Sequence, residues 1–186
     1  MAVEVERARR RFTRAEYRRM VDVGILRPED RVELIRGEIV EMSPPGRRHI
    51  AYVNNLNQLL VLRLAGRAVV SVQNPVVVAD DSEPQPDLAV LRARSYKEAE
   101  PDREDVLLLI EVAETSLRYD RSTKLRLYAE TGIPEYWVVD CAAEAVEVHR
   151  GAAAHGYRQV TRIDRDGTVS PAAFPDASLA IQEIFA

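Results

Sequence analysis

The chain has 186 residues, of which 46% are hydrophobic and 30% are charged, and its formal net charge is -4. This length and composition fit one domain with a buried core, and the net acidity argues against a protein that coats nucleic acid through its overall charge. A single cysteine, Cys141, excludes an internal disulfide and a cysteine-cluster metal site, which fits a reducing cytosol.

The sequence has no apolar stretch of the ~20 residues that crossing a bilayer requires. Its start, MAVEVERARRRF, has basic residues but no apolar signal core, so we expect a cytoplasmic protein with no membrane partner. Cys141 follows an apolar run typical of a strand, and we interpret it as a packing residue rather than a nucleophile.

A short amphipathic helix is predicted over residues 13–23. Thr13 is a favourable N-cap residue and Glu16 follows it by three places, which is the pattern of a capping box. Gly24 is placed to end this helix.

A β-hairpin is predicted next, in RVELIRGEIVEM, because apolar and polar residues alternate there around an Arg-Gly pair. We interpret the chain, residues 1–186, as a single nuclease-like domain in two parts. Residues 1–46 form an N-terminal extension made of the helix and the hairpin, and residues 47–186 form the core.

The core begins with a long helix and three strands. Apolar residues recur at helical spacing from His49 to about Arg63, and Gly66 ends this helix. Three apolar runs follow, rich in β-branched residues or apolar on both faces, and they predict strands over 68–79, 87–91 and 105–114.

The second half of the core predicts a helix over residues 120–132, with Gly132 as its C-cap, and a buried strand over 135–140. The path from the third strand through this helix to the next strand is a candidate βαβ crossover. Residues 145–150 and 157–163 alternate around a turn and predict antiparallel edge strands, after which the tail ends in a short helix.

Two carboxylates and a lysine fall where burial is expected. Asp87 opens the second core strand, and Glu111 interrupts the apolar run LLLIEVA of the third. A buried carboxylate is costly unless it is paired or bound to a metal, so two acids on neighbouring strands would form a hard-oxygen site suited to Mg²⁺ or Mn²⁺. Lys124, one of only two lysines, lies about one turn into the following helix, where its ammonium can reach the same cleft.

The order α-β-β-β-α-β, with Pro-Asp at the second strand and a glutamate in the third, resembles the PD-(D/E)XK nuclease fold. The segments RVELIRGEIVEMSPPGRRH, EPQPDLAVL, LLLIEVAETSLRYDRSTKLRLYAETGIPEYWVVD and SPAAFPDASLAI together resemble the bacterial Uma-type family of restriction-endonuclease-like proteins, also called domain of unknown function 820. The resemblance runs from about Phe12 to the C-terminus. It implies an α/β fold class with a mixed α+β sheet, in which a restriction-endonuclease-like core follows the N-terminal helix and hairpin.

The resemblance also implies a metal-dependent phosphodiesterase site, with metal ligands at Asp87 and Glu111 and the carbonyl of Val112 as an additional ligand. The usual pattern has a lysine two residues after the glutamate, and this chain has Ala113 there. The family supplies the amine from the following helix instead, and Lys124 within DRSTKLRLYA is the matching residue.

Three more side chains are candidates with open alternatives. Glu38 matches the family's Gly-Glu after the hairpin turn and would add a third carboxylate, or it is a solvated hairpin residue. His49 binds phosphate or polarises water, or it packs at the start of its helix. Gln85 would contact a metal-bound water or the DNA backbone.

For Asp87 and Glu111 the structural alternative is a capped turn and a buried ion pair with Arg118 or Arg121. The functional interpretation is favoured because both acids and the lysine occur in the expected order. In the functional interpretation, Asp87 and Glu111 hold Mg²⁺, which activates a water for attack on the scissile phosphate. Lys124 orients that water or offsets the charge that develops on the phosphate oxygens.

The sequence therefore predicts a Mg²⁺- or Mn²⁺-dependent endonuclease that hydrolyses DNA. Cutting both strands needs two sites, so we expect a homodimer formed through the edge strands. Alternatives are a nuclease-fold module that binds nucleic acid or a protein without turnover, and an enzyme acting on another phosphate ester. Arginines concentrated near the N-terminus suit phosphate contact or form a solvated arm, namely Arg7, Arg9, Arg10, Arg11, Arg14, Arg18 and Arg19.

Overall fold

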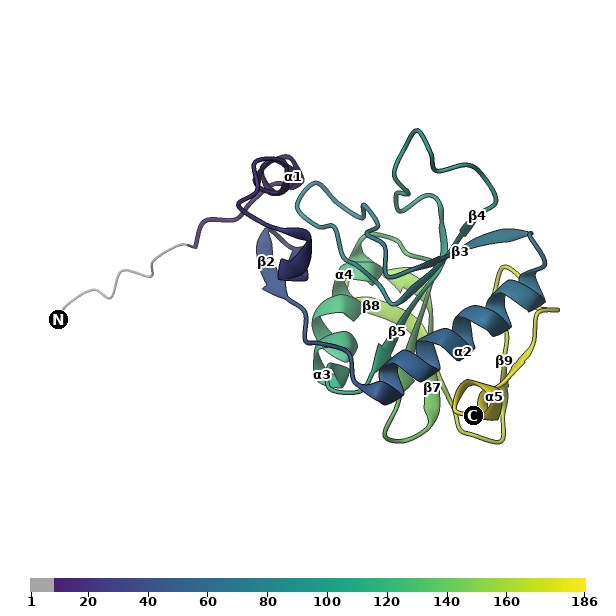
Figure 1. Ribbon diagram of the computed structural model, residues 1–186. Helices are drawn as coiled ribbons and strands as arrows, with labels where there is room; N and C mark the ends of the chain where they lie inside the picture. The colour runs from purple at the N-terminus through teal and green to yellow at the C-terminus, as the bar shows by residue number, and fades with distance from the viewer. Residues whose placement is uncertain (1–8) are drawn as a thin grey trace.

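The computed structural model describes residues 9–186, and its centre is a six-stranded sheet (Figure 1). The strand order is β3-β4-β5-β6-β7-β8, and every neighbouring pair is antiparallel except β5 and β6. The parallel pair is connected through a helical segment, as the predicted crossover requires. The strands are β3 (Ala68–Val72), β4 (Leu88–Arg92), β5 (Val106–Ala113), β6 (Glu135–Asp140), β7 (Ala145–Ala153) and β8 (Gly156–Ile163).

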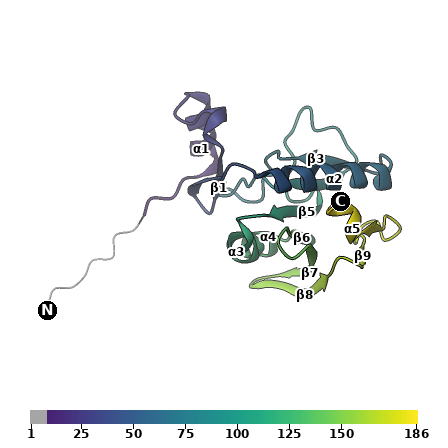
Figure 2. The same ribbon diagram turned by 60° about the horizontal axis from the view of Figure 1, so that its bottom comes forward.

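One face of the sheet is covered by α2 (Arg47–Leu64) and the C-terminal α5 (Ile181–Ile184), which lie beside each other (Figure 2). Alternate residues of β5, such as Leu108 and Ile110, pack into this layer together with the apolar stripe of α2. The long helix predicted from His49 to Arg63 is thus confirmed, and it begins two residues earlier, at Arg47.

The opposite face is covered by a continuous helical segment made of α3 (Leu117–Tyr119), the π-helical turn η2 (Asp120–Lys124) and α4 (Leu125–Glu130). The intervening residues of the strands pack against this segment, as Leu109 does in β5. Because side chains alternate along a strand, Glu111 points to the same face as Leu109.

The N-terminal helix and hairpin form at the end of the molecule opposite to α5 (Figures 1 and 2). The helix α1 (Arg14–Asp22) starts with the predicted capping box between Thr13 and Glu16. A 3-10 turn, η1 (Pro28–Asp30), leads to the hairpin of β1 (Val32–Ile35) and β2 (Glu38–Glu41). The hairpin turns at Arg36 and Gly37 with positive φ angles of 51° and 76°, as a two-residue turn of this kind requires.

Three predicted elements differ from the structure. The strand predicted over 68–79 ends at Val72, because Gln73 has a positive φ of 51° and turns the chain out of the sheet. The helix predicted to start at Asp120 starts at Leu117 and passes through the π-helical turn. Residues 145–150 do not form an edge strand, because β7 lies between β6 and β8.

The C-terminal tail forms β9 (Thr168–Val169), β10 (Leu179–Ala180) and the short terminal helix that the sequence predicts. Cys141 is buried in the layer under α2, in agreement with a packing role, and burial raises the pKa of its thiol to about 12. Within residues 9–186 no helix is both long and apolar enough to cross a membrane.

Candidate active site

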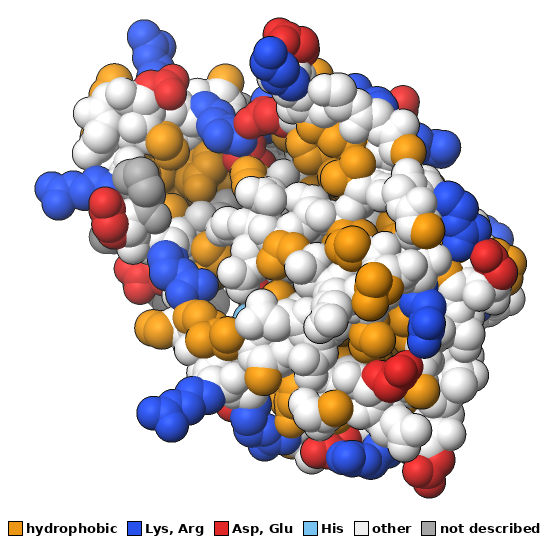
Figure 3. Space-filling view, turned by 45° about the vertical axis from the view of Figure 1, so that its right-hand side comes forward, with side chains coloured by type: hydrophobic (Ala, Val, Ile, Leu, Met, Phe, Trp, Pro, Cys, Tyr) orange, Lys and Arg blue, Asp and Glu red, His pale blue; other side chains and the backbone are white. Residues whose placement is uncertain are grey.

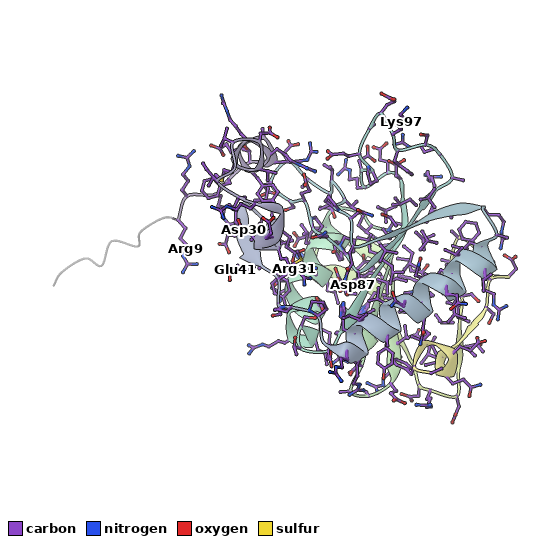
Figure 4. The ribbon with its side chains drawn as sticks, in the orientation of Figure 1. Arg9, Asp30, Arg31, Glu41, Asp87 and Lys97 are labelled. Atoms are coloured by element: carbon purple, nitrogen blue, oxygen red, sulfur yellow. The ribbon has the colours of Figure 1, made fainter. Side chains whose placement is uncertain are left out.

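A cleft of about 350 Å³ opens between the N-terminal hairpin, the start of α2 and the ends of β4 and β5. Figure 4 shows Arg31 and Glu41 on the hairpin side of this region and Asp87 on the sheet side. The charged and polar side chains that line the cleft include Arg31, Glu33, Glu41, His49, Gln85, Asp87, Glu111, Glu114, Ser116, Tyr119, Asp120 and Lys124. The structure therefore brings Asp87, Glu111 and Lys124, all predicted from the sequence, into one cavity.

Asp87 is positioned at the junction of β4 and β5, which are neighbours in the sheet. Its Oδ2 accepts a 2.8 Å hydrogen bond from the backbone N–H of Val112. Its Oδ1 lies 3.0 Å from His49 Nε2 and also accepts a hydrogen bond from Gln73. The carboxylate is thus fixed in direction by the backbone of β5 and remains on the cleft wall.

Glu111 is 4% exposed and is held mainly through one of its oxygens. Its Oε1 accepts hydrogen bonds from Lys124 Nζ at 2.9 Å and from Tyr128 Oη at 2.8 Å. The alternative prediction, an ion pair of Glu111 with Arg118 or Arg121, was wrong. Arg121 pairs instead with Asp140 and Glu147, at a different position of the sheet.

The π-helical turn η2 explains how a helix supplies the amine. Asp120 and Lys124 are four residues apart, and both are buried on the side of the turn that faces the cleft. The N–H of Leu125 donates to the carbonyl of Asp120, which is the wider i to i+5 spacing that defines a π-turn. Such turns are frequent at functional sites, and this one places an acid and an amine side by side in the cavity.

Glu33 is a cleft residue that sequence reasoning missed. It is 2% exposed, and its Oε2 lies 3.2 Å from Lys124 Nζ and accepts a hydrogen bond from the N–H of Gln85. The alternation of the hairpin gives no sign that Glu33 is buried, whereas the structure places it against Lys124 of η2 and the backbone of Gln85. The available signal was a glutamate in a strand whose other residues are apolar.

The ionisable groups of the cleft are strongly coupled. Burial alone would lower the pKa of Lys124, but the carboxylates of Glu111, Glu33 and Asp120 outweigh burial and raise it, so the ammonium stays charged. Burial raises the pKa of Glu111 well above its ordinary value. The charge of Lys124 lowers this pKa, whereas the charges of the neighbouring carboxylates raise it further. Burial likewise raises the pKa of Asp120 to about 6. The cleft therefore has more buried acids than buried cations.

His49, near the start of α2, and Glu114, directly after β5, form another wall of the cleft. The ring of His49 lies between Asp87 and the carbonyl oxygen of Val112, which is 2.8 Å from Nδ1. Burial lowers the pKa of this histidine, but the hydrogen bond and the charge of Asp87 outweigh burial and raise it overall. Glu114 Oε2 accepts a 3.3 Å hydrogen bond from the N–H of His49, which compensates for the absence of a capping side chain at Gly46.

Two other candidates have different outcomes. Glu38 does not line the cleft: it is exposed, and its nearest cation is Arg11 at 3.9 Å. This position agrees with the alternative interpretation of Glu38 as a solvated hairpin residue. Gln85 does line the cleft, where its backbone N–H binds Glu33 and its side chain donates to the carbonyl of Gln73.

The arginine-rich segment is largely engaged in ion pairs within the chain. Arg14 and Arg18 both bind Glu83 and Glu100, and Arg10 binds Glu16. Arg7 lies outside the described residues. On the face seen in Figure 3, basic and acidic side chains are interspersed around the periphery.

The donor set of the cleft matches a hard divalent cation, because it offers carboxylate oxygens and a backbone carbonyl. Among residues 9–186, no group of three or more His, Cys, Asp or Glu side chains already surrounds one point as a metal cage does. Mg²⁺ is usually bound by only one or two carboxylates and keeps several waters, so the two acids of the predicted set are sufficient for it.

Comparisons with known proteins identify the family and the fold. The model of the family Uma2, described as "Putative restriction endonuclease", matches residues 14–182. A solved structure described as "a putative nuclease belonging to DUF820", from Anabaena variabilis, superposes with a TM-score of 0.70 at 18% sequence identity, covering 88% of this chain and 94% of that one. The fold is thus the expected restriction-endonuclease-like one. No curated protein matches the chain.

Proposed function

The chain belongs to the Uma2 family, and on that premise we propose that it is a metal-dependent endonuclease that hydrolyses DNA phosphodiester bonds in the cleft. The observation that carries the proposal is the meeting of Asp87, Glu111 and Lys124 in one cavity, although they come from three different elements. A packed core has no need to gather these groups beside an open cleft, whereas phosphodiester hydrolysis uses them together.

The metal would be held by Asp87 and Glu111, with the carbonyl of Val112 as a further oxygen donor. When bound, Mg²⁺ or Mn²⁺ would polarise the scissile phosphate and lower the pKa of a coordinated water. The excess of buried carboxylates supports this assignment, since a divalent cation offsets their mutual repulsion. Asp87 is kept in direction by the N–H of Val112, so one ligand is pre-oriented.

Lys124 acts as a fixed positive charge. Its raised pKa means that the ammonium does not take a proton from water near neutral pH, so it is unsuited to the role of general base. Two carboxylates and a helical turn fix its Nζ, which then orients the attacking water or offsets charge on the phosphate oxygens. Tyr128 supports the same arrangement by donating to Glu111.

DNA is the proposed substrate, and the rim of the cleft supports it. Arg31 lines the opening, and Arg47 is exposed at the start of α2, so phosphates beside the scissile bond would meet cations. Homodimerisation also remains a prediction. The outer strand β8 offers Val160, which is 59% exposed, as an apolar contact.

The test is cleavage of supercoiled DNA, single-stranded DNA and RNA with Mg²⁺ or Mn²⁺. Glu111→Gln and Asp87→Asn should each reduce the rate by about 10²- to 10³-fold, because each removes a charge that acts on the reacting phosphate or its metal. Lys97→Ala should leave the rate unchanged, since Lys97 lies at the tip of the loop between β4 and β5, away from Asp87 (Figure 4).

Equal cleavage by wild type and Glu111→Gln would contradict the proposal. Binding of nucleic acid without cleavage under every metal condition would instead favour the silent binding module. Cleavage of another phosphate ester, with DNA and RNA intact, would identify a different substrate for the same site.

A further inference from the structure

The groups proposed to act on the phosphate are recessed in the cleft. Glu111 is 4% exposed and Lys124 is 5% exposed, and the side chain of Asp87 is 13% exposed. A phosphate that stays on the outer surface of the protein cannot contact all three. The scissile phosphate therefore has to enter the cleft.

The space that receives the phosphate is small. Its volume of about 350 Å³ is at the lower end of the range of roughly 300–1,000 Å³ that is usual for small-molecule pockets. In an intact duplex, each strand carries a phosphate every ~3.4 Å along the axis, and the helix stays straight over a persistence length of about 150 base pairs. One phosphate of such a duplex does not enter a recess without its neighbours, whereas an unpaired strand bends into it.

The walls of the cleft are held in place by contacts between the hairpin and the core. The N–H of Glu83 donates a 2.8 Å hydrogen bond to the carbonyl of Leu34 in β1, and Glu33 of the same strand pairs with Lys124. The loop that leads from the hairpin to α2 contains two consecutive prolines, whose φ angles are fixed by their rings. Widening the cleft to admit a duplex would break these contacts.

The charge of the cleft also disfavours a duplex. Within the described residues, six acids line it against two basic residues, Arg31 and Lys124. Lys124 is already paired with two of those acids. Proteins that hold a duplex through its backbone neutralise several phosphates with lysines and arginines. Affinity for the substrate therefore has to come largely from contacts of another kind.

Nonpolar side chains in the cleft offer such contacts. Tyr119, the last residue of α3, lines the cleft with a partly exposed side chain, and Val40, Met42, Pro44 and Pro45 line it from the hairpin and the loop that follows. Aromatic rings on which successive bases stack are the usual means of binding single strands without sequence preference. The bases of a duplex are already stacked on one another, so only an unpaired base can use the ring of Tyr119.

We propose that the cleft accepts an unpaired strand, with one phosphodiester beside Asp87, Glu111 and Lys124 and a neighbouring base stacked on the ring of Tyr119. The inference rests on the proposed nuclease function and specifies its substrate as single-stranded DNA or an unpaired segment of a duplex. Negatively supercoiled DNA qualifies, because supercoiling favours local unpairing. Relaxed, fully paired DNA does not.

The first experiment compares cleavage in Mn²⁺ of four DNAs: a single strand, the same sequence as a paired duplex, the same duplex with a central unpaired bubble, and a relaxed closed plasmid. The single strand and the bubble should be cut at least about tenfold faster than the paired duplex, because unpairing and unstacking a base costs a few kcal/mol. Initial rates for wild type give this ratio.

The second experiment measures binding of a labelled single strand by fluorescence anisotropy, with every variant built in a Glu111→Gln background to slow cleavage. Tyr119→Ala should weaken binding by roughly five- to one-hundred-fold, because it removes the stacking surface. Tyr119→Phe keeps the ring and should recover most of that affinity, since the hydroxyl of Tyr119 has no hydrogen-bond partner within the described residues.

The matched control is Tyr96→Ala, which should bind the strand like its parent. Tyr96 lies outside the cleft, beside Lys97 in the loop between β4 and β5 (Figure 4). Thermal melting verifies that each variant is folded.

The outcomes separate this inference from the proposed function. Cleavage of the paired duplex and the relaxed plasmid as fast as the single strand would overturn the substrate preference and leave the nuclease intact. Single-strand binding that Tyr119→Ala leaves unchanged would overturn the role of Tyr119. Tight binding through Tyr119 with no cleavage of any DNA would refute hydrolysis and support the binding mode, and absence of both would overturn both proposals.

Discussion

Glu111 and Glu135 are two buried glutamates on neighbouring parallel strands, with very different surroundings. Glu135, at the start of β6, is 1% exposed and accepts hydrogen bonds from Trp137 Nε1, Arg150 Nε and the N–H of Ala172. Its two oxygens are saturated by donors, and one donor is a full cation. Glu111 is similarly buried, but its Oε1 shares the single ammonium of Lys124 with a second acid.

The comparison distinguishes a carboxylate with a structural role from one that we propose to be functional. A buried charge that has its own cation and hydrogen bonds contributes to a unique fold, and removing it leaves unpaired donors. A buried carboxylate that shares its cation with a second acid is only partly neutralised. Where it borders a cleft, a further cation in the cleft would stabilise it. Burial alone, which is all that a sequence pattern indicates, does not distinguish the two.

The largest expected difference between Glu111 and Glu135 is in the stability of variants that lack each side chain. Glu135→Ala should lower the free energy of unfolding by about 2–4 kcal/mol, because it leaves the buried indole N–H of Trp137 without its acceptor and removes the carboxylate that pairs with the half-exposed Arg150. Glu111→Ala should cost less, since it also relieves the repulsion among the acids of the cleft. Urea unfolding monitored by circular dichroism measures both values, with exposed Glu98→Ala as control. Equal losses for Glu111 and Glu135 would remove the distinction.

A second effect concerns pH and Asp120. The ordinary pKa of an aspartate is 3.8, and burial raises the pKa of Asp120 to about 6 in the folded protein. The raised value means that the protonated form is favoured by folding, so its contribution to stability is complete below about pH 4 and is lost as the pH rises through about 6. The loss corresponds to about 3 kcal/mol.

The Asp120→Asn variant cannot titrate at this position, so its free energy of unfolding should rise relative to wild type by that amount between pH 4 and pH 7. Urea unfolding across this range measures the difference. The control is Asp166→Asn, an exposed aspartate for which the difference should stay constant. A constant difference for Asp120→Asn would mean that the acids of the cleft are already neutralised.

The smallest effect is expected from a comparison of Glu33 with Glu38, one from each strand of the hairpin. Glu33→Gln should lower the rate of DNA cleavage by about tenfold, because it removes one of the charges that position Lys124. Glu38→Gln should leave the rate unchanged, since Glu38 is exposed and lies outside the cleft. Initial rates of plasmid nicking give both numbers, and a larger loss for Glu38 would place the reacting phosphate on the outer side of the hairpin.

Local pattern was sufficient to predict most of the fold. The buried strand β6 appears at its predicted bounds, because an apolar run such as its YWVV, between a helix and a turn, has few other conformations. The run 68–79 was misread because periodicity does not show that Gln73 adopts a positive φ. The π-helical turn also has no periodic signature, since it adds only one residue to a turn.

The site was predicted in part, for a related reason. Asp87 opens an apolar run and Glu111 interrupts one, and that contrast is visible in a sequence. Glu33 becomes a cleft residue only through the packing of the hairpin on the sheet, which is a tertiary contact. Asp120 carried a usable signal, namely its spacing of four residues from Lys124, which puts both on one side of a helix.

The origin of the amine has a consequence for folding. A lysine two residues after Glu111 would be aligned by the strand alone, but here that position is Ala113 and the amine arrives from η2. An intermediate with a complete sheet and an undocked helical segment would therefore hold both acids and lack the cation opposite them. For the proposed function, the charge set of the cleft would then be complete only once the helical segment has packed on the sheet.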